Sequence, residues 1–124
     1  MKYVILIHSN PQPWGHPTAD FLPQYESLSA AEREQQGAEF DALLSDLSER
    51  GELVGGQALG DPRDARLFRY EGGRRKMTDG PYAETAEHFA GFFLIDVADQ
   101  ARAEEVAEQF SGPGETVELR PVAQ

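Results

Sequence analysis

The sequence contains no cysteine, and this absence narrows both its structure and its chemistry. Disulfide bonds, thiolate metal sites and cysteine nucleophiles are all excluded. No apolar run approaches the roughly 20 residues that a helix needs to cross a bilayer. The N-terminus passes from Lys2 directly into a β-branched run that ends at His8-Ser9-Asn10, without the small-residue cleavage site of a signal peptide. These absences predict a cytoplasmic protein that has no membrane partner.

Basic residues are also scarce. The chain has 11 of them against 22 acidic residues, which gives a net charge of −11. A field of this sign repels phosphate backbones and anionic lipids, so we expect neither nucleic acid nor membrane as a partner. One basic group runs against the trend and surrounds a predicted hairpin: Arg63, Arg66, Arg69, Arg74, Arg75 and Lys76. It either attracts an anion or protects the hairpin edges from pairing with other strands.

Several common catalytic signatures are missing as well. The sequence has no glycine-rich phosphate loop, no Gly-x-Ser-x-Gly nucleophile turn and no dinucleotide-binding fingerprint. No two of the histidines His8, His16 and His88 have the spacing of metal ligands. We therefore expect no metal and no cofactor.

The chain is predicted to form a single domain over residues 1–124. Residues 2–7 are dense in β-branched and aromatic side chains, which is typical of a strand. Both faces of this strand are apolar, which predicts that it is covered on both sides. A polar, Pro-rich segment follows over residues 9–28, and a loop of that length in a small domain favours a lid or an arm.

Two helices are predicted between the strands. Ser29-Ala30-Ala31-Glu32 is a capping-box pattern that begins the first helix, and Gly51 ends it. Its apolar stripe consists of Phe40, Leu43, Leu44 and Leu47. Asp99 caps the second helix, whose buried side is formed by Ala103, Val106, Ala107 and Phe110.

Further strands are predicted at residues 53–59, 65–70, 74–78, 92–97 and 116–120, with Gly72-Gly73 turning a hairpin. The order β-α-β-(hairpin)-β-α-β predicts an α+β, ferredoxin-like split βαβ fold with an inserted β-hairpin. Two helices can cover only one face of that sheet, although its strands point apolar side chains both ways. A second sheet is the simplest cover for the other face. We therefore predict a homodimer with the sheets packed face to face.

The most distinctive segment is Asp79-Gly80-Pro81-Tyr82-Ala83-Glu84-Thr85, followed by Glu87 and the strand at residues 91–97. Together with the ending Val117-Glu118-Leu119-Arg120-Pro121-Val122, it resembles the YCII-related family in its DGPF branch. Tyr82 stands where that branch usually has Phe, and Ala86 where Lys is common. The resemblance spans nearly the whole chain and implies a dimeric α/β barrel.

Characterised relatives in the wider family imply a histidine–aspartate pair that acts on small, often aromatic or cyclic molecules without a metal or organic cofactor. In those relatives the histidine lies on the first helix, whereas residues 29–50 of this chain contain none. The pair therefore cannot be transferred residue by residue. His8 with Asp79 would have to substitute for it, on the basis of strand-end position alone.

Each member of this substitute pair has two readings. His8 is either a proton shuttle near neutral pH or a strand-end histidine bonded to backbone. Asp79 is either a general base that also orients His8, or the residue that holds the Asp-Gly-Pro turn through backbone hydrogen bonds. The sequence leaves both alternatives open.

The predicted site is a pocket at the C-terminal end of the first strand, bounded by His8, the 79–87 loop and the Pro-rich segment around Trp14. Trp14 would supply an apolar wall. The candidate substrate-binding residues are Trp14, Tyr82, Glu84, Glu87 and Arg120. Arg120 would either bind a substrate carboxylate or pair with a nearby acid.

The leading functional hypothesis is a cofactor-independent acid–base enzyme of lyase or isomerase type, acting on a small, cyclic or aromatic molecule. Its alternative is a non-catalytic ligand-binding or regulatory module on the same dimeric fold. A cofactor-free oxygenase is supported by fold analogy only. Whether the protein is an enzyme is left open by the sequence.

Overall fold

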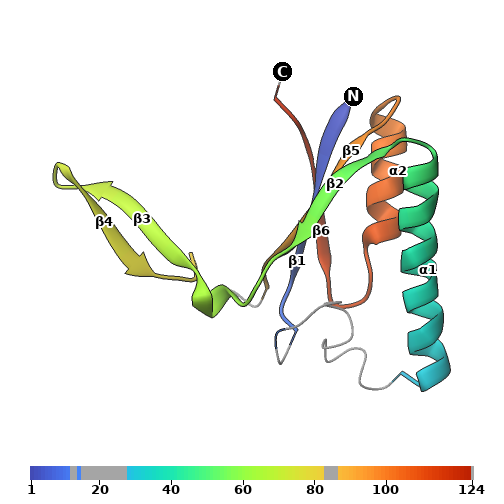
Figure 1. Cartoon of the computed structure of the whole chain (residues 1–124), viewed down its shortest axis with the longest axis horizontal. Coiled ribbons are helices and arrows are strands. Elements are labelled where there is room, and N and C mark those ends of the chain that lie inside the picture. Colours follow the sequence, from blue (N-terminus) through green and yellow to red (C-terminus); the bar gives the residue numbers. More distant parts are fainter. Residues whose placement is uncertain (12–13, 15–27, 83–86, 124) are drawn as a thin grey trace.

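The computed structural model describes residues 1–11, 14, 28–82 and 87–123. Its main sheet has four strands in the order β2-β5-β1-β6, all neighbours antiparallel. The strands are β1 (Lys2–Ser9), β2 (Leu53–Ala58), β5 (His88–Asp96) and β6 (Thr116–Pro121). The helices α1 (Ala30–Glu49) and α2 (Gln100–Phe110) lie together on one face of this sheet (Figure 1). The predicted α+β, ferredoxin-like fold is confirmed.

The hydrophobic core lies between the helices and that face. β1 alternates in burial, so that Tyr3, Ile5 and Ile7 are buried while Val4, Leu6 and His8 are only half-buried. This follows from the strand period of two. The helices contribute the buried side chains Leu43, Leu47, Ala103, Val106 and Phe110. The predicted apolar stripes of both helices therefore supply the core, although Phe40 is still 38% exposed.

The helix starts follow from the expected caps. The Ser29 hydroxyl accepts a hydrogen bond from the backbone N–H of Glu32 at 3.1 Å, and the Asp99 carboxylate accepts one from the N–H of Arg102 at 2.9 Å. Each bond satisfies one of the donors that a helix N-terminus leaves unpaired. No helix in the described ranges is both long enough and apolar enough to span a bilayer.

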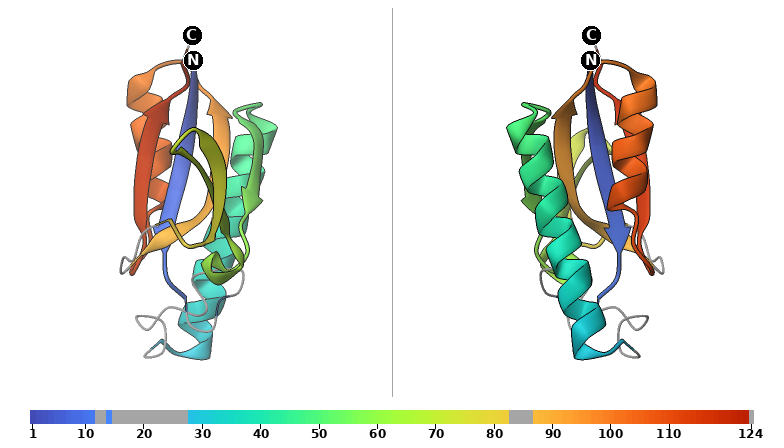
Figure 2. Two further views of the ribbon diagram at one scale, coloured as in Figure 1. Left: turned by 90° about the vertical axis from the view of Figure 1, so that its left-hand side faces the viewer. Right: turned by 90° about the vertical axis from the view of Figure 1, so that its right-hand side faces the viewer.

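The other face of the sheet, here called the open face, carries no helix (Figure 2). Val4 and Leu6 of β1 pair with Leu94 and Phe92 of β5, and all four side chains are half-buried. The described residues of one chain therefore do not supply the cover that the apolar strands predict on this side. The face-to-face homodimer stays a prediction.

The inserted hairpin forms a separate two-stranded sheet, β3 (Arg66–Glu71) and β4 (Arg74–Asp79), here called the arm. It projects away from the body on the open-face side (Figures 1 and 2). Its turn requires glycine, because Gly72 and Gly73 have φ values of +58° and +77°. A short 3₁₀ helix, η3 (Pro62–Asp64), leads into the arm. The sequence predicted this hairpin, with a shift of one residue at its ends.

The strand β5 differs most from its predicted bounds. β5 begins at His88, four residues before the predicted start at Phe92. The extension pairs with the end of β1, where Ser9 lies opposite His88 and His8 opposite Phe89 after a shift in register at Ile7/His8. Phe89 is 42% exposed, so this end of β5 is not part of the buried apolar run from which the strand was predicted. Of the Pro-rich segment, residues 12–13 and 15–27 lie outside the described part of the chain.

Candidate functional site

His8 lies at the C-terminal end of β1 and points to the open face. The antiparallel register places it opposite Thr116 on β6, and opposite Phe89 on β5. The imidazole and the Phe89 ring have centroids 5.9 Å apart. The side chain is 31% exposed. A histidine at this position is shielded by an aromatic neighbour and still reachable from solvent.

A carboxylate meets this histidine from the neighbouring strand. His8 Nε2 lies 3.2 Å from Glu118 Oε1, and Glu118 Oε2 lies 3.8 Å from Arg120 Nε. Glu118 and Arg120 are two residues apart on β6, so both side chains project from the open face beside His8. The result is a polar row of His8, Glu118 and Arg120 across two adjacent strands.

The pairing orients the imidazole. An ionised carboxylate only accepts, so Nε2 donates to Glu118 when that carboxyl is ionised. Among the described residues, no hydrogen bond is seen to the other ring nitrogen, Nδ1. A histidine oriented by a carboxylate in this way is suited to acid–base chemistry.

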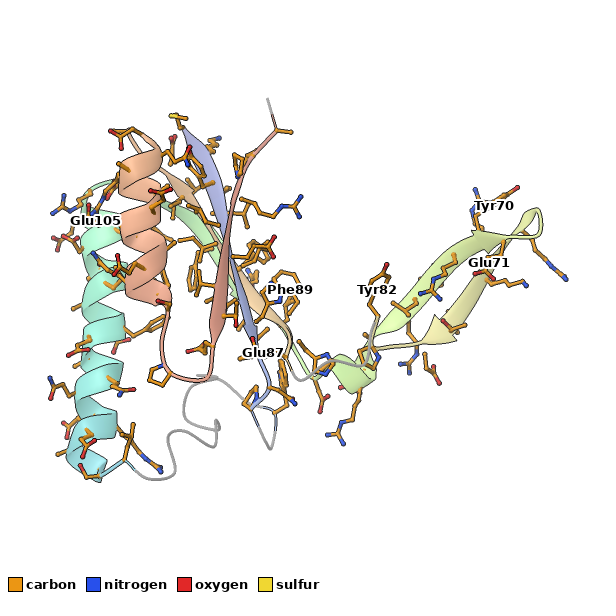
Figure 3. The ribbon with its side chains drawn as sticks, turned by 180° about the vertical axis from the view of Figure 1, so that it is seen from behind. Tyr70, Glu71, Tyr82, Glu87, Phe89 and Glu105 are labelled. Carbon is orange, nitrogen blue, oxygen red and sulfur yellow. The ribbon has the colours of Figure 1, made fainter. Side chains whose placement is uncertain are left out.

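A cavity of about 560 Å³ adjoins His8 at the base of the arm, and we call it the arm-base cavity. Its walls combine two histidines, three acidic residues and the rings of Tyr82 and Phe89. The lining residues are His8, Gly60, Asp61, Pro62, Asp64, Ala65, Leu67, Pro81, Tyr82, Glu87, His88 and Phe89. Figure 3 places Phe89 and Tyr82 between the sheet and the arm, with Glu105 on the distant helix layer.

Two of the acidic lining residues have fixed partners. The Asp61 carboxylate accepts hydrogen bonds from Arg63 Nη2 at 2.7 Å and from the Arg63 backbone N–H at 2.9 Å. The Arg63 guanidinium and backbone hold the pKa of Asp61 below its ordinary value. The Thr116 hydroxyl donates to Glu87 Oε1 at 3.0 Å, which ties the start of β5 to the start of β6. Both carboxylates are therefore held in place at the cavity wall.

In the structure Asp79 pairs with an arginine and not with His8. Its carboxylate lies 3.4 Å from Arg66 Nε and is 83% exposed, and Asp79 does not line the arm-base cavity. His8 pairs with Glu118 instead. The predicted association of His8 with Asp79 is therefore not seen in the hydrogen bonds or ion pairs of either residue.

The Asp-Gly-Pro segment closes the base of the arm. The Gly80 backbone N–H donates to the Ala65 carbonyl at 2.8 Å. A Cβ at Gly80 would lie 2.7 Å from the Ala65 Cβ, so the close approach of the two strands needs glycine here. The motif therefore fixes where the arm leaves the body.

The other predicted binding residues lie in several places. Tyr82 and Glu87 line the arm-base cavity together with His8. The Trp14 indole N–H donates to the Leu59 carbonyl at 3.0 Å, and Trp14 does not line that cavity. Arg120 belongs to the polar row on β6. Glu84 lies outside the described residues.

A second cavity, of about 580 Å³, opens on the helix side of the sheet, and we call it the helix-side cavity. Phe93 and Phe110 stack in its wall with centroids 4.7 Å apart, and Phe40 meets both rings edge-on. Gln36 also lines the cavity, and its buried side-chain oxygen meets no donor within the described residues. Buried acceptors are nearly always paired, so this oxygen is suited to a ligand or a water.

No group of three or more His, Asp or Glu side chains within the described residues is arranged to hold a metal ion. The polar row has one histidine and one carboxylate in contact, and the third member is a cation. The polar row is therefore a histidine–carboxylate contact with a neighbouring cation.

The sequence patterns did not predict a site role for Glu118, which appears there only within the segment at residues 117–122. A signal was present, because Glu118 is a charged residue flanked by Val117 and Leu119 in a short strand. In a ferredoxin-like sheet the last strand borders the first, so its polar positions share a face with His8. The register that makes them neighbours is a tertiary property, which the sequence did not provide.

The architecture and its polar open face define a small α+β protein with the ferredoxin-like sheet topology. Comparison with known proteins gives the family. The model of the YCII-related domain matches residues 1–123, so the chain belongs to the YCII-related family. An uncharacterised protein of Rhizobium meliloti (strain 1021) is 32% identical over 105 residues, covering 79% of this chain and 85% of that protein.

Proposed function

We propose that this protein is a cofactor-independent acid–base enzyme of lyase or isomerase type, with His8 as the proton carrier and the arm-base cavity as the substrate site. The observation that carries the proposal is the 3.2 Å contact between His8 Nε2 and Glu118 Oε1 beside that cavity. Glu118 takes the orienting role that the sequence had suggested for Asp79.

In this reaction His8 Nδ1 accepts a proton from the substrate and later returns it to another substrate atom. Glu118 holds the imidazole in the tautomer that leaves Nδ1 unprotonated, and its charge then stabilises the imidazolium that forms. Arg120, 3.8 Å from Glu118, is placed to attract an anionic group of the substrate.

The cavity walls suggest the class of molecule. Tyr82 and Phe89 supply aromatic surface, which suits a small cyclic or aromatic compound. Glu87 and Asp61 are held in place by their partners and can accept hydrogen bonds from ligand hydroxyl or amino groups. The Asp79-Gly80-Pro81 turn at the cavity edge also supports placement in the DGPF branch of the family.

The proposal includes a homodimer that joins through the open face. Half-buried Val4, Leu6, Phe92 and Leu94 form an apolar area in the middle of that face. A second sheet packed on it would remove this area from water and would narrow the access of solvent to the polar row. A cytoplasmic location likewise stays a prediction.

The test begins with a panel of small metabolites screened by thermal shift, since a bound ligand stabilises the fold by mass action. Stabilising compounds are then incubated with the protein and followed by NMR for change. We expect His8→Ala to abolish turnover and Glu118→Gln to lower it by about 10²-fold or more, whereas the matched control Glu105→Gln retains it. A compound that is turned over equally by His8→Ala would refute the assignment.

A second candidate function is a non-catalytic binding module that uses the helix-side cavity. The stacked rings of Phe93 and Phe110 and the unpaired oxygen of Gln36 favour a flat ligand with one hydrogen-bond donor. On this reading a stabilising compound is not altered, Gln36→Leu weakens its binding, and His8→Ala does not. The two functions are thus separated by whether the compound is altered and by the opposite responses expected of His8→Ala and Gln36→Leu.

A further inference from the structure

One face of the arm carries three large apolar side chains that stay mostly exposed, and the Arg75 guanidinium on the same face lies 5.8 Å from the centroid of the Tyr70 ring. Phe68, Tyr70 and Met77 are 74%, 69% and 55% exposed. Phe68 lies opposite Met77 in the register, and Tyr70 is two residues further along β3, so the three side chains share one face. Large apolar side chains gathered on an exposed surface are typical of an interaction site.

The arm also differs from the body in charge. Five basic and two acidic side chains in residues 66–79 give it a net charge of +3, which leaves −14 for the other 110 residues. Opposite charges on two surfaces favour their association and fix its orientation. The arm of one chain is therefore electrostatically matched to the body of another.

The direction of the arm is suited to the same partner. It leaves the body on the side of the open face, away from α1 and α2 (Figures 1 and 2). A second copy seated on the open face must therefore lie beside the arm. A nucleic acid or an anionic membrane that bound the arm would instead be repelled by the body.

Two contacts join the chain segments at the base of the arm. The Gly80 N–H donates to the Ala65 carbonyl at 2.8 Å. The Arg69 guanidinium lies 5.8 Å from the centroid of the Tyr82 ring, within the range of a cation–π contact. An arm that leaves the body in a defined direction loses less entropy when it binds.

From these observations we infer that the arm clasps a second copy of this chain. Phe68, Tyr70 and Met77 pack on that copy, and Arg75, which shares their face of the arm, lies against its acidic surface. The inference rests on the homodimer proposed above and extends it, because each chain then reaches past the paired sheets to grip the other.

The direct test uses the absence of cysteine, which makes a single introduced cysteine a unique labelling position. Unlabelled Glu71→Cys protein carrying a nitroxide near the arm tip is mixed with ¹⁵N-labelled wild-type chain. We expect broadening of amide signals in the body of the ¹⁵N chain, which arises only between chains. A dimer whose body signals are not broadened overturns the clasp and leaves the homodimer intact, whereas a monomeric mixture overturns both.

A second measurement compares dimer dissociation constants by sedimentation. The triple variant Phe68→Ser/Tyr70→Ser/Met77→Ser changes only exposed side chains, so it is expected to fold, and its dissociation constant should rise about 100-fold or more. The control Ala101→Ser on the exposed side of α2 should not change it. A triple variant that dimerises as tightly as wild type would refute the clasp.

The charge complementarity is tested separately. Arg75→Glu should weaken the dimer, and the difference from wild type should shrink as salt is added, because exposed charges are screened. Arg50→Glu, in which an exposed arginine of the helix layer is reversed, is the control for net charge. Equal effects of both variants would contradict a specific role for the arm.

Discussion

The two faces of the main sheet are built from the same strands and yet have different environments. On β1, Ile5 is 0% exposed beneath the helices, whereas its neighbour Leu6 is half-buried on the open face. The helix-covered face is filled with apolar side chains, and the open face also carries the polar row of His8, Glu118 and Arg120. One face therefore stabilises the fold, and the other carries the proposed site and the proposed dimer interface.

The largest expected effect is the loss of a core side chain from the covered face. Ile5→Ala should lower the free energy of unfolding by about 2–5 kcal/mol, since it removes buried methyl groups and leaves a cavity. Leu6→Ala, one residue along, should cost less than half as much. Urea unfolding at one low protein concentration compares them, and equal costs would mean that the open face is already covered within one chain.

A second prediction compares adjacent glycines of β2. A Cβ at Gly56 would lie 2.6 Å from Phe93 Cδ1 and 2.7 Å from the Phe92 carbonyl oxygen, whereas a Cβ at Gly55 would meet nothing within 4 Å. Gly56→Ala should therefore cost about 1–3 kcal/mol of unfolding free energy, and Gly55→Ala should cost little or stabilise. Thermal melts of the two variants test this prediction. A larger loss of stability for Gly55→Ala than for Gly56→Ala would contradict the close contacts described at Gly56.

A third prediction concerns the ion pair that ties β2 to α2. The Arg102 guanidinium binds Glu52 through two hydrogen bonds of 2.8 and 3.0 Å, and the side chains are only 19% and 14% exposed. This contact holds the pKa of Glu52 below its ordinary value of 4.5. The stabilisation is thus complete above the unfolded-state pKa and is lost as pH falls through the lower pKa of the folded protein.

Glu52→Gln should therefore cost about 1–3 kcal/mol at neutral pH, and the difference from wild type should shrink in acid. The matched control is Asp46→Asn, because the Asp46–Arg50 pair is at least half exposed and worth little. Denaturant melts across pH 3–7 give both comparisons. A constant gap between Glu52→Gln and wild type over that range would contradict the assigned cause.

The smallest effect is expected at the arm. Asp79 is 83% exposed in its pair with Arg66, so Asp79→Ala should change the free energy of unfolding by no more than about 1 kcal/mol. Gly80→Ala should cost more, because its Cβ would collide with Ala65. A large loss on Asp79→Ala would mean that its carboxylate holds the turn, as one reading of the sequence proposed.

The fold was largely predictable because its local signals agree with its topology. The caps at Ser29 and Asp99, the glycine turn and the strand alternation each specify a local structure, and short connections limit the ways to join them. The site was only partly predictable. His8 and the pocket at its strand end follow from position, but its partner Glu118 is 110 residues away. Only strand register brings these two residues together.

Association of two chains through the open face underlies both the proposed site and the proposed clasp. Sedimentation equilibrium at micromolar concentration tests it with wild type, Leu6→Glu on the open face and Ala101→Glu on the exposed side of α2. We expect wild type and Ala101→Glu at twice the 13.7 kDa chain mass, and Leu6→Glu as a folded monomer. A monomeric wild type, or a Leu6→Glu variant that dimerises as tightly, would contradict the claim.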